Sequence, residues 1–390
     1  METFIYKHKK PDVDIELRSI DEKINTAISK FFDQYFENFF ISSNDLLSRF
    51  YPTFENELFS YFDRKYPVNI NPFTLQDSIF NNLTIISIHY QNFGLYNMAQ
   101  EYWEHILNSV LSWEKLRKER IHKGSIYYFW AENALLNNEI DKGFFLIHNS
   151  FIEDCITHKT NNPNTPSQKT VSLNADENNL LFGFVLSLKE KILEYIKKYN
   201  KDNQKTMTEG VFNNKFLLNP PSKDLLFSFS HSIALINQIF RFQPYVRQSD
   251  FAGMYEINVL FNLVLVIDNL LFRKTHDQNS RDDWKFLILI KNLLSRSNIE
   301  KNQDNFYSNI KSVNKSVDHN FDQTILELIE KRYKFPEPQN ISPLYFDIFL
   351  CYVIRNNRAH NISLSSSIAK NFPAITTSVF NVLLLSIEID

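Results

Sequence analysis

Near the C-terminus, an arginine and a histidine are spaced so that they could act together on a phosphate ester. Arg355 and His360 are separated only by the residues Asn-Asn-Arg-Ala. An imidazole has an ordinary pKa of about 6.5, so it can take or give a proton near neutral pH. A guanidinium stays charged and binds phosphate oxygens through two parallel hydrogen bonds. The pair therefore suits phosphodiester cleavage without a metal ion, in which one side chain transfers a proton and the other stabilises the charged phosphorane.

The element that must position these side chains is an apolar helix. Apolar residues recur at steps of three and four and predict one buried face, formed by Phe346, Phe349, Leu350 and Val353. We expect this helix to span residues 343–361, because the proline-rich segment before it forces a break. At about 100° per residue, the same face continues through Asn357 and His360, where apolar residues are expected. Asn356 lies four residues before His360, so its amide can hold the imidazole in one orientation.

Arg355 and His360 do not share one face of an ideal helix. Five residues correspond to roughly 140° of rotation. The two head groups therefore meet only through the reach of the arginine side chain, a distortion of the helix, or a second copy of the chain. The third possibility predicts a dimer. The competing interpretation is a helix end with solvated arginines and a histidine that is an ordinary core residue.

The pattern Arg-Asn-x-x-x-His, late in a helical region, resembles the R-x4-6-H motif of the HEPN superfamily. The resemblance implies a helical-bundle domain over residues 222–390, metal-independent endoribonuclease activity, and a composite cleft between two protomers. Arg355 and His360 would be the catalytic pair, and Asn356 the polar residue that commonly follows the arginine. Arg358 has no fixed counterpart in the motif, and we expect it to contact the RNA substrate together with Asn357. We expect no cofactor and no metal ion.

The composition favours an all-α protein. The chain has only 6 glycines and 13 prolines in 390 residues, and aromatic residues make up 15%. Few helix breakers and long amphipathic runs without two-residue alternation are typical of helical folds. The formal net charge of -3 gives no overall attraction to nucleic acid, so RNA must bind through a local patch. The absence of a glycine-rich phosphate loop and of paired metal carboxylates counts against a nucleotide hydrolase or a metallonuclease.

Two stretches of the N-terminal half resemble the tetratricopeptide repeat, a hairpin of two helices. Small residues at Ala99 and Gly143 would allow the helices to approach closely. Gly94 and Asn138 suit the turn between helices, because both residue types tolerate positive φ. The copies are about 44 residues apart instead of the usual 34 or so, which we attribute to a first hairpin extended to about Arg120.

We expect three regions along the chain: a helical region over 1–75, tetratricopeptide-like repeats over 76–200 with a polar linker at 157–178, and the HEPN-like bundle over 222–390. The helices expected in the bundle lie near 224–242, 251–273, 281–296, 323–333, 343–361 and 373–389. Residues 297–322 are rich in Asn, Ser and Lys, which predicts a mobile loop. Of the polar residues in the first two helices, His231, Glu256 or Asp268 could face the motif helix and tune His360; otherwise they are surface or capping groups.

The densest basic segment spans residues 115–123. One interpretation makes Arg117, Lys118, Arg120 and Lys123 a phosphate-contacting patch. The other is an ordinary solvated helix face, because Glu114 and Glu119 are interspersed.

The chain is expected to be cytoplasmic and not to bind membranes. Cys155 and Cys351 lie in apolar helical contexts and predict buried thiols of a reducing compartment. The N-terminus lacks the apolar core of a signal peptide, and the apolar run 257–272 is too short to span a bilayer. The main hypothesis is an endoribonuclease of a toxin or defence-type system that leaves a 2′,3′-cyclic phosphate, with the repeats binding a protein partner. The alternatives are a non-catalytic interaction scaffold whose C-terminal bundle dimerises, and a bundle that accepts a nucleotide modification.

Overall fold

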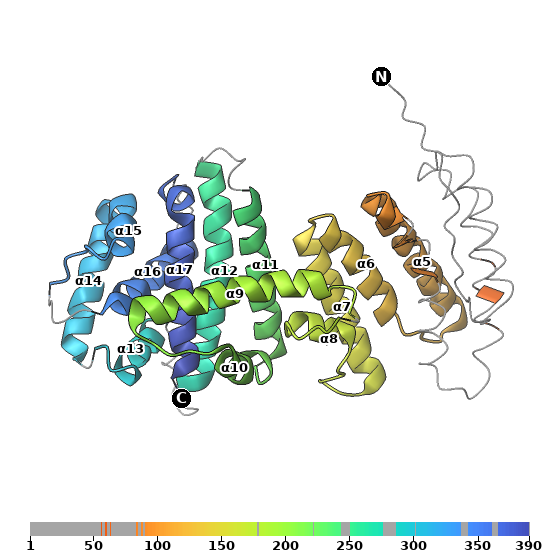
Figure 1. The fold of residues 1–390 in the computed structure, drawn as a ribbon, viewed down its shortest axis with the longest axis horizontal. Helices are drawn as coiled ribbons and strands as arrows, with labels where there is room; N and C mark the ends of the chain where they lie inside the picture. Colours follow the sequence, from red (N-terminus) through yellow and green to blue (C-terminus); the bar gives the residue numbers. More distant parts are fainter. Residues whose placement is uncertain are drawn as a thin grey trace, which may run out of the picture. The chain divides into compact units, whose positions relative to one another are not determined.

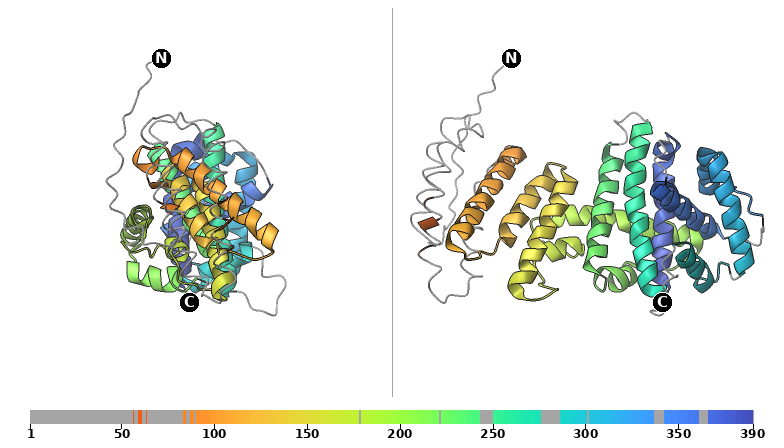
Figure 2. Two further views of the ribbon diagram at one scale, coloured as in Figure 1. Left: turned by 90° about the vertical axis from the view of Figure 1, so that its right-hand side faces the viewer. Right: turned by 180° about the vertical axis from the view of Figure 1, so that it is seen from behind.

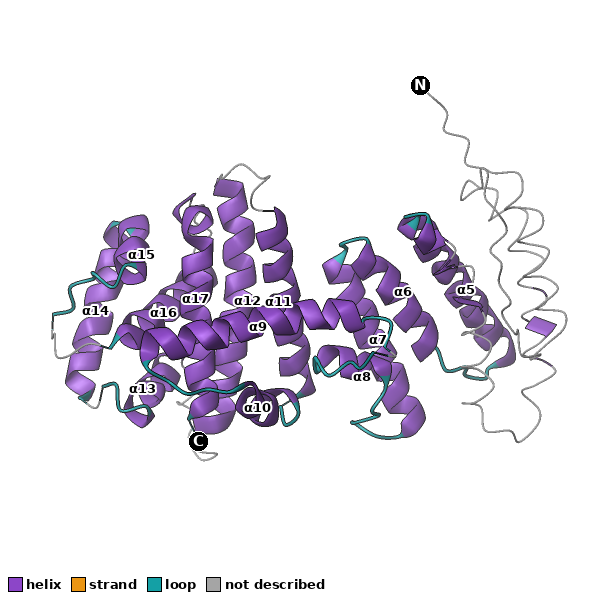
Figure 3. Ribbon diagram, in the orientation of Figure 1, coloured by secondary structure: helices purple, strands orange, loops and turns teal. Residues whose placement is uncertain are grey.

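In the computed structural model, every regular element of the described residues is a helix (Figure 3). The structure describes residues 90–389 except 178, 221, 243–249, 276–285, 301, 337–341 and 361–365, together with a few separate positions between 56 and 88. The predicted all-α fold is confirmed. The helical region expected over 1–75 lies almost entirely outside the described residues. The chain forms two compact units, Met1–Lys169 and Thr170–Asp390.

Among the described residues of the first unit, three long helices pack in sequence order: α5 (Tyr96–Arg117), α6 (Gly124–Leu136) and α7 (Ile140–His158). The middle helix, α6, contacts both neighbours (Figure 1). Bulky aromatic side chains fill the space between α5 and α6, and the ring of Trp103 stacks on that of Phe129 with centroids 5.3 Å apart. Packing of large side chains therefore holds these helices together, as expected for a sequence poor in alanine.

The turns of the first unit have the backbone conformation that the sequence predicts. Asn138 adopts a φ of 61° and Gly94 a φ of 69°, which confirms that both positions are left-handed. A Cβ atom added at Gly143 would lie 2.5 Å from the side chain of Leu135. The missing side chain therefore lets α7 approach α6 closely. Helix α5 ends at Arg117, three residues before the end we expected.

The second unit is built around α12 (Asp250–Thr275). This central helix contacts four others: α11 (Lys223–Phe242), α13 (Phe286–Arg296), α16 (Pro343–His360) and α17 (Ser366–Glu388). α12 and α17 lie side by side in both Figure 1 and Figure 2. At their ends, Nζ of Lys274 donates hydrogen bonds to the main-chain oxygens of Ile387 and Ile389. A lysine at the C-terminal end of a helix is stabilised by the helix dipole, so this contact joins the ends of the two core helices.

Two segments of these core helices, Ala252–Lys274 and Ile368–Glu388, are long and apolar enough to cross a membrane by length and composition. The first is longer than the apolar run expected at 257–272. Most of each segment is buried inside the unit. Both segments are therefore packed as core helices here.

The division between the units lies earlier in the chain than we expected. Helix α9 (Phe182–Asn203) was assigned to the repeat region, but it belongs to the second unit and contacts α11, α16 and α17 (Figure 1). Tyr195 stacks on Phe380 with ring centroids 3.8 Å apart, and the hydroxyl of Tyr199 donates a hydrogen bond to Glu388. The apolar face of α9 packs on α17. The polar stretch that follows α9 therefore does not mark the boundary between the two units. The expected linker 157–178 contains the short helix α8 (Pro166–Val171).

The segment expected to be a mobile loop, 297–322, is mostly helical. α14 (Gln303–His319) begins after Asn302, whose side chain accepts hydrogen bonds from the main-chain N–H groups of residues 304 and 305. It buries Phe306, Ile310 and Val313, which recur at steps of four and three. That periodicity was present in the sequence, but the surrounding polar residues concealed it. After α14, the chain continues into α15 (Phe321–Ile329). Two short helices, α10 (Glu209–Phe212) and η2 (Asn213–Leu217), lie earlier in the chain, after α9.

Candidate active site

Helix α16 carries the Arg-Asn-x-x-x-His motif. It begins at Pro343 and ends at His360, close to the predicted span of 343–361. Every residue from 344 to 354 is buried, so the helix is covered on all sides and not on one face only. Arg355 and Asn356 are the first residues after this run that are partly exposed. The motif therefore starts where α16 leaves the core.

Arg355 is joined to the central helix of the unit. Its Nε donates a hydrogen bond to Oδ2 of Asp268 on α12, with the two atoms 3.4 Å apart. The carboxylate is 8% exposed, whereas the arginine side chain is 28% exposed. Burial raises the pKa of Asp268, and the charge and hydrogen bond of Arg355 partly oppose this rise. Asp268 therefore faces the motif helix, and its expected effect on His360 stays a prediction.

Two carboxylate oxygens on α12 have no hydrogen-bond partner among the described residues. They are Oδ1 of Asp268 and Oε2 of Glu256. Burial raises the pKa of Glu256 to about 7, so this carboxyl changes its charge near neutral pH. A buried polar atom without a partner costs free energy, and such atoms are common at functional sites. Helix α12 therefore carries two separate buried carboxyl groups, each with a raised pKa.

The remaining motif residues are described by their backbone only. Asn357, Arg358 and His360 lie in the last turn of α16, but their side chains are outside the described part of the structure. The helical backbone keeps the spacing on which the motif depends. The meeting of Arg355 with His360, and the orientation of the imidazole by Asn356, stay predictions.

A second polar group on α16 was not found from the sequence. Asp347 is fully buried and accepts hydrogen bonds from Nζ of Lys331 and from Nδ2 of Asn381, the latter over 2.8 Å. A lone aspartate inside the apolar run 344–354 was the available signal, because an isolated buried carboxylate requires a partner. The lysine comes from the turn that follows α15, and the asparagine comes from α17. The network therefore fixes α16 between two neighbouring helices.

Tyrosine hydroxyls join α14 to α16. Nδ2 of Asn309 donates to the hydroxyl of Tyr345 over 2.9 Å, and Nδ2 of Asn314 donates to that of Tyr352 over 3.1 Å. Burial raises the pKa of Tyr345 to about 12, so its hydroxyl stays protonated. These bonds, together with the Asp347 network, make α16 a rigid support for its partly exposed end.

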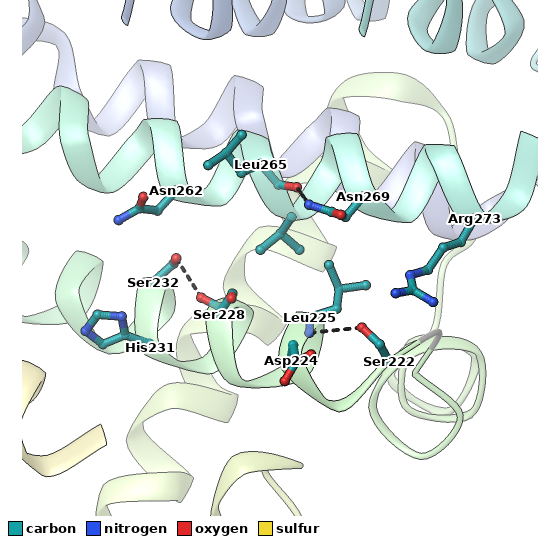
Figure 4. A pocket seen from close by; sticks show the side chains of 11 residues that line it. Ser222, Asp224, Leu225, Ser228, His231, Ser232, Asn262, Leu265, Asn269 and Arg273 are labelled. Atoms are coloured by element: carbon teal, nitrogen blue, oxygen red, sulfur yellow. Dashed lines mark hydrogen bonds between the residues drawn. The ribbon is translucent and has the colours of Figure 1, made fainter. Parts of the chain in front are cut away.

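A cavity of about 440 Å³ lies between α11 and α12. Figure 4 shows His231 and Asn262 at one end and Arg273 with Ser222 and Asp224 at the other. We considered that His231 might face the motif helix, but the structure places it in the lining of this cavity. The cavity is concave and polar, and nothing in the sequence pattern had indicated it.

The basic segment 115–123 is largely neutralised within the first unit. Arg117 forms an ion pair with Asp63, and Arg120 forms one with Glu153, each over 2.6 Å. Lys123 is buried against Glu114. These contacts favour a structural role for the segment over a phosphate-binding patch. Cys155 is only half-buried, contrary to our expectation, whereas Cys351 is buried as expected.

Within the described residues, no group of three or more His, Cys, Asp or Glu side chains is arranged to hold a metal ion. The fold and the site define an all-helical protein whose C-terminal unit carries an arginine–carboxylate pair at the end of a buried helix. No protein-family model, curated protein or solved structure matches the chain.

Proposed function

We propose that the chain is a metal-independent endoribonuclease whose active site is formed at the end of α16. The observation that carries the proposal is the position of Arg355, which is partly exposed beside a buried carboxylate at the start of the motif. A guanidinium held by one carboxylate oxygen keeps other N–H donors for a phosphate.

In the proposed reaction, the ribose 2′-oxygen attacks the adjacent phosphorus. The bond from the 2′-oxygen to phosphorus forms and the bond from phosphorus to the 5′-oxygen breaks, leaving a 2′,3′-cyclic phosphate and a 5′-hydroxyl. His360 takes part in moving the proton from the 2′-oxygen to the leaving 5′-oxygen. Arg355 stabilises the charge of the phosphorane, and Asn356 orients the imidazole. Arg358 and Asn357 contact the RNA on either side of the cleaved bond.

The site is completed by a second copy of the chain in this proposal. Arg355 and His360 are roughly 140° apart on one helix, so two copies of α16 would bring the four side chains into one cleft. The biological setting that fits such an activity is a cytoplasmic toxin or defence system. The helices of the first unit would then bind a partner that restrains or triggers cleavage.

The proposal is tested by incubating total RNA with the full chain in EDTA. Wild type should degrade the RNA, whereas Arg355→Lys and His360→Ala should each be slower by about 100-fold or more. Arg332→Lys and His319→Ala are the matched controls, because both replace exposed residues of the same unit. Circular dichroism and light scattering establish that each protein is folded and report its oligomeric state. Intact RNA with folded wild-type dimer would contradict the proposal.

A second candidate is a non-catalytic protein-binding scaffold. Helix α7 exposes Phe145, Ile152 and Ile156 on one face, with Phe145 66% exposed. An exposed apolar stripe on a helical hairpin favours contact with another protein. The RNA assay separates the two candidates, because a scaffold leaves RNA intact in every variant.

A further inference from the structure

We propose that the cavity between α11 and α12 binds a nucleoside monophosphate, with the phosphate at the Arg273 end and the base at the end formed by His231 and Asn262. This site lies on a different side of α12 from Asp268. Asn262, Asn269 and Arg273 are spaced by seven and four residues, so they follow one face of the helix, roughly 100° from Asp268. The proposal is therefore separate from the nuclease site.

The size and chemistry of the cavity select a small polar ligand. Its volume of about 440 Å³ lies within the range of about 300 to 1,000 Å³ that is common for small-molecule sites. Eight of the eleven lining residues are polar, and only Leu225, Leu265 and Val266 are apolar. An apolar ligand would cover these polar side chains and remove their hydrogen bonds to water without replacing them.

Several lining groups are available to a ligand. The side chains of Asn262, Ser228 and Asp224 are exposed in the lining, so a ligand can reach them. The side-chain nitrogen of Asn269 donates to the main-chain oxygen of Leu265 over 2.9 Å, which leaves its oxygen as an acceptor. The cavity thus offers an amide with both donor and acceptor atoms, a hydroxyl and a carboxylate. These groups match the edge of a base and the hydroxyls of a ribose.

The two ends of the cavity differ in charge. Figure 4 shows the guanidinium of Arg273 beside Ser222 at one end, whereas the imidazole of His231 lies at the other. A guanidinium has five N–H donors, so it can bind a phosphate while it keeps another contact. The imidazole is the only ring in the lining and supplies a plane on which a base can stack. Asp224 lies beside Ser222 at the Arg273 end, where its carboxylate can accept hydrogen bonds from ribose hydroxyls.

Isothermal titration of the full-length protein tests the assignment with AMP, GMP, CMP and UMP, and with adenosine and inorganic phosphate. At least one monophosphate should bind with a Kd below about 1 mM. Arg273→Gln should weaken that binding by about tenfold or more, because a charge-assisted bond to the phosphate is lost. The same variant should leave binding of the matching nucleoside unchanged. Asn262→Leu should weaken the binding of both the monophosphate and the nucleoside. Arg241→Gln, on the exposed end of α11, should weaken the binding of neither.

Four results would overturn the assignment. The first is that none of the four monophosphates binds, and the second is that wild type binds inorganic phosphate as tightly as it binds a monophosphate. The third is that Arg273→Gln and Asn262→Leu both bind the monophosphate with wild-type affinity. The fourth is that a short single-stranded RNA binds but no monophosphate does. The RNA arm uses His360→Ala protein so that the strand is not cleaved. Monophosphate binding by folded protein that leaves RNA intact would support this proposal and contradict the nuclease proposal, so the two proposals fail separately.

Discussion

Arg355 on α16 donates a hydrogen bond from Nε to Oδ2 of Asp268 on α12, with the two atoms 3.4 Å apart. The bond joins the helix that carries the motif to the helix that contacts four others in the second unit. It uses one guanidinium donor and one carboxylate oxygen. The other N–H groups of the guanidinium can donate to a ligand, and the second carboxylate oxygen, Oδ1, has no hydrogen-bond partner among the described residues.

Asp268→Asn should reduce RNA cleavage without removing the arginine. An amide oxygen still accepts the bond from Arg355 but has no charge with which to hold the guanidinium in place. A small displacement of a catalytic group costs on the order of 100-fold, so we expect a loss of roughly 10- to 100-fold in kcat with little change in KM. Steady-state kinetics on a short RNA measure this. Asp318→Asn, an exposed residue of α14, is the control and should retain full activity.

Glu256 should make the protein less stable as the pH rises. Its folded pKa of about 7 lies above its ordinary value of 4.5, so between these values the folded state holds a proton that the unfolded state has lost. The contribution of Glu256 to the free energy of unfolding is therefore fully present below about pH 4.5 and is lost as the pH passes through 7. One pKa unit corresponds to about 1.4 kcal/mol, so the loss is at most about 3 kcal/mol.

Urea unfolding of wild type and Glu256→Gln between pH 4.5 and pH 8 measures this loss. The variant should gain stability relative to wild type as the pH rises. Glu190→Gln, an exposed residue on α9, should follow wild type throughout. Parallel curves for wild type and Glu256→Gln would show that folding does not raise the pKa of Glu256.

Lys331 is partly exposed and pairs with the fully buried Asp347, so removing the lysine should destabilise the second unit. Lys331→Met leaves Asp347 with only the hydrogen bond from Asn381, and we expect a cost of up to about 3 kcal/mol, the lower end of the range for a fully buried pair. The double variant Lys331→Met with Asp347→Leu should recover much of the loss, because no charge then remains buried. Thermal unfolding measures both, with exposed Lys334→Met as the control. A double variant less stable than Lys331→Met would contradict this account.

Asn302→Ala should destabilise α14. The Asn302 side chain accepts the main-chain hydrogen bonds that begin this helix, and loss of such a cap costs about 0.5 to 2 kcal/mol. Asn305→Ala changes a residue inside the same helix and should be neutral or slightly stabilising, because alanine has the higher helix propensity. Equal denaturation midpoints for Asn302→Ala and wild type would show that the segment does not depend on its cap.

The fold class and most helices of the second unit followed from periodicity, because buried faces repeat at steps of three and four. The boundary that we expected at 200–222 was wrong. That segment is polar, but α9 before it belongs to the second unit through contacts such as that of Tyr195 with Phe380, which local sequence does not reveal. α14 did have a local signal, but it was weak. Phe306, Ile310 and Val313 are few and lie among many polar residues.

The candidate site was predictable only in its residue types. The spacing of Arg355 and His360 indicated the chemistry, and Asp268 was one of three polar residues that could face the motif helix. Which one did so depends on the rotation of α12 against α16, which a sequence does not encode locally. The cavity at Arg273 arises from the gap between two helices, and no single stretch of residues specifies such a gap.

The most direct measurement is analysis of the ends of the products formed from a defined single-stranded RNA in EDTA. The account predicts that wild type produces fragments with 2′,3′-cyclic phosphate and 5′-hydroxyl ends, and that 2′-O-methyl RNA of the same sequence stays intact. It also predicts that Arg355→Lys and His360→Ala lose this cleavage. Fragments with 5′-phosphate ends, cleavage of the 2′-O-methyl RNA, or intact RNA with the folded wild-type protein would contradict it.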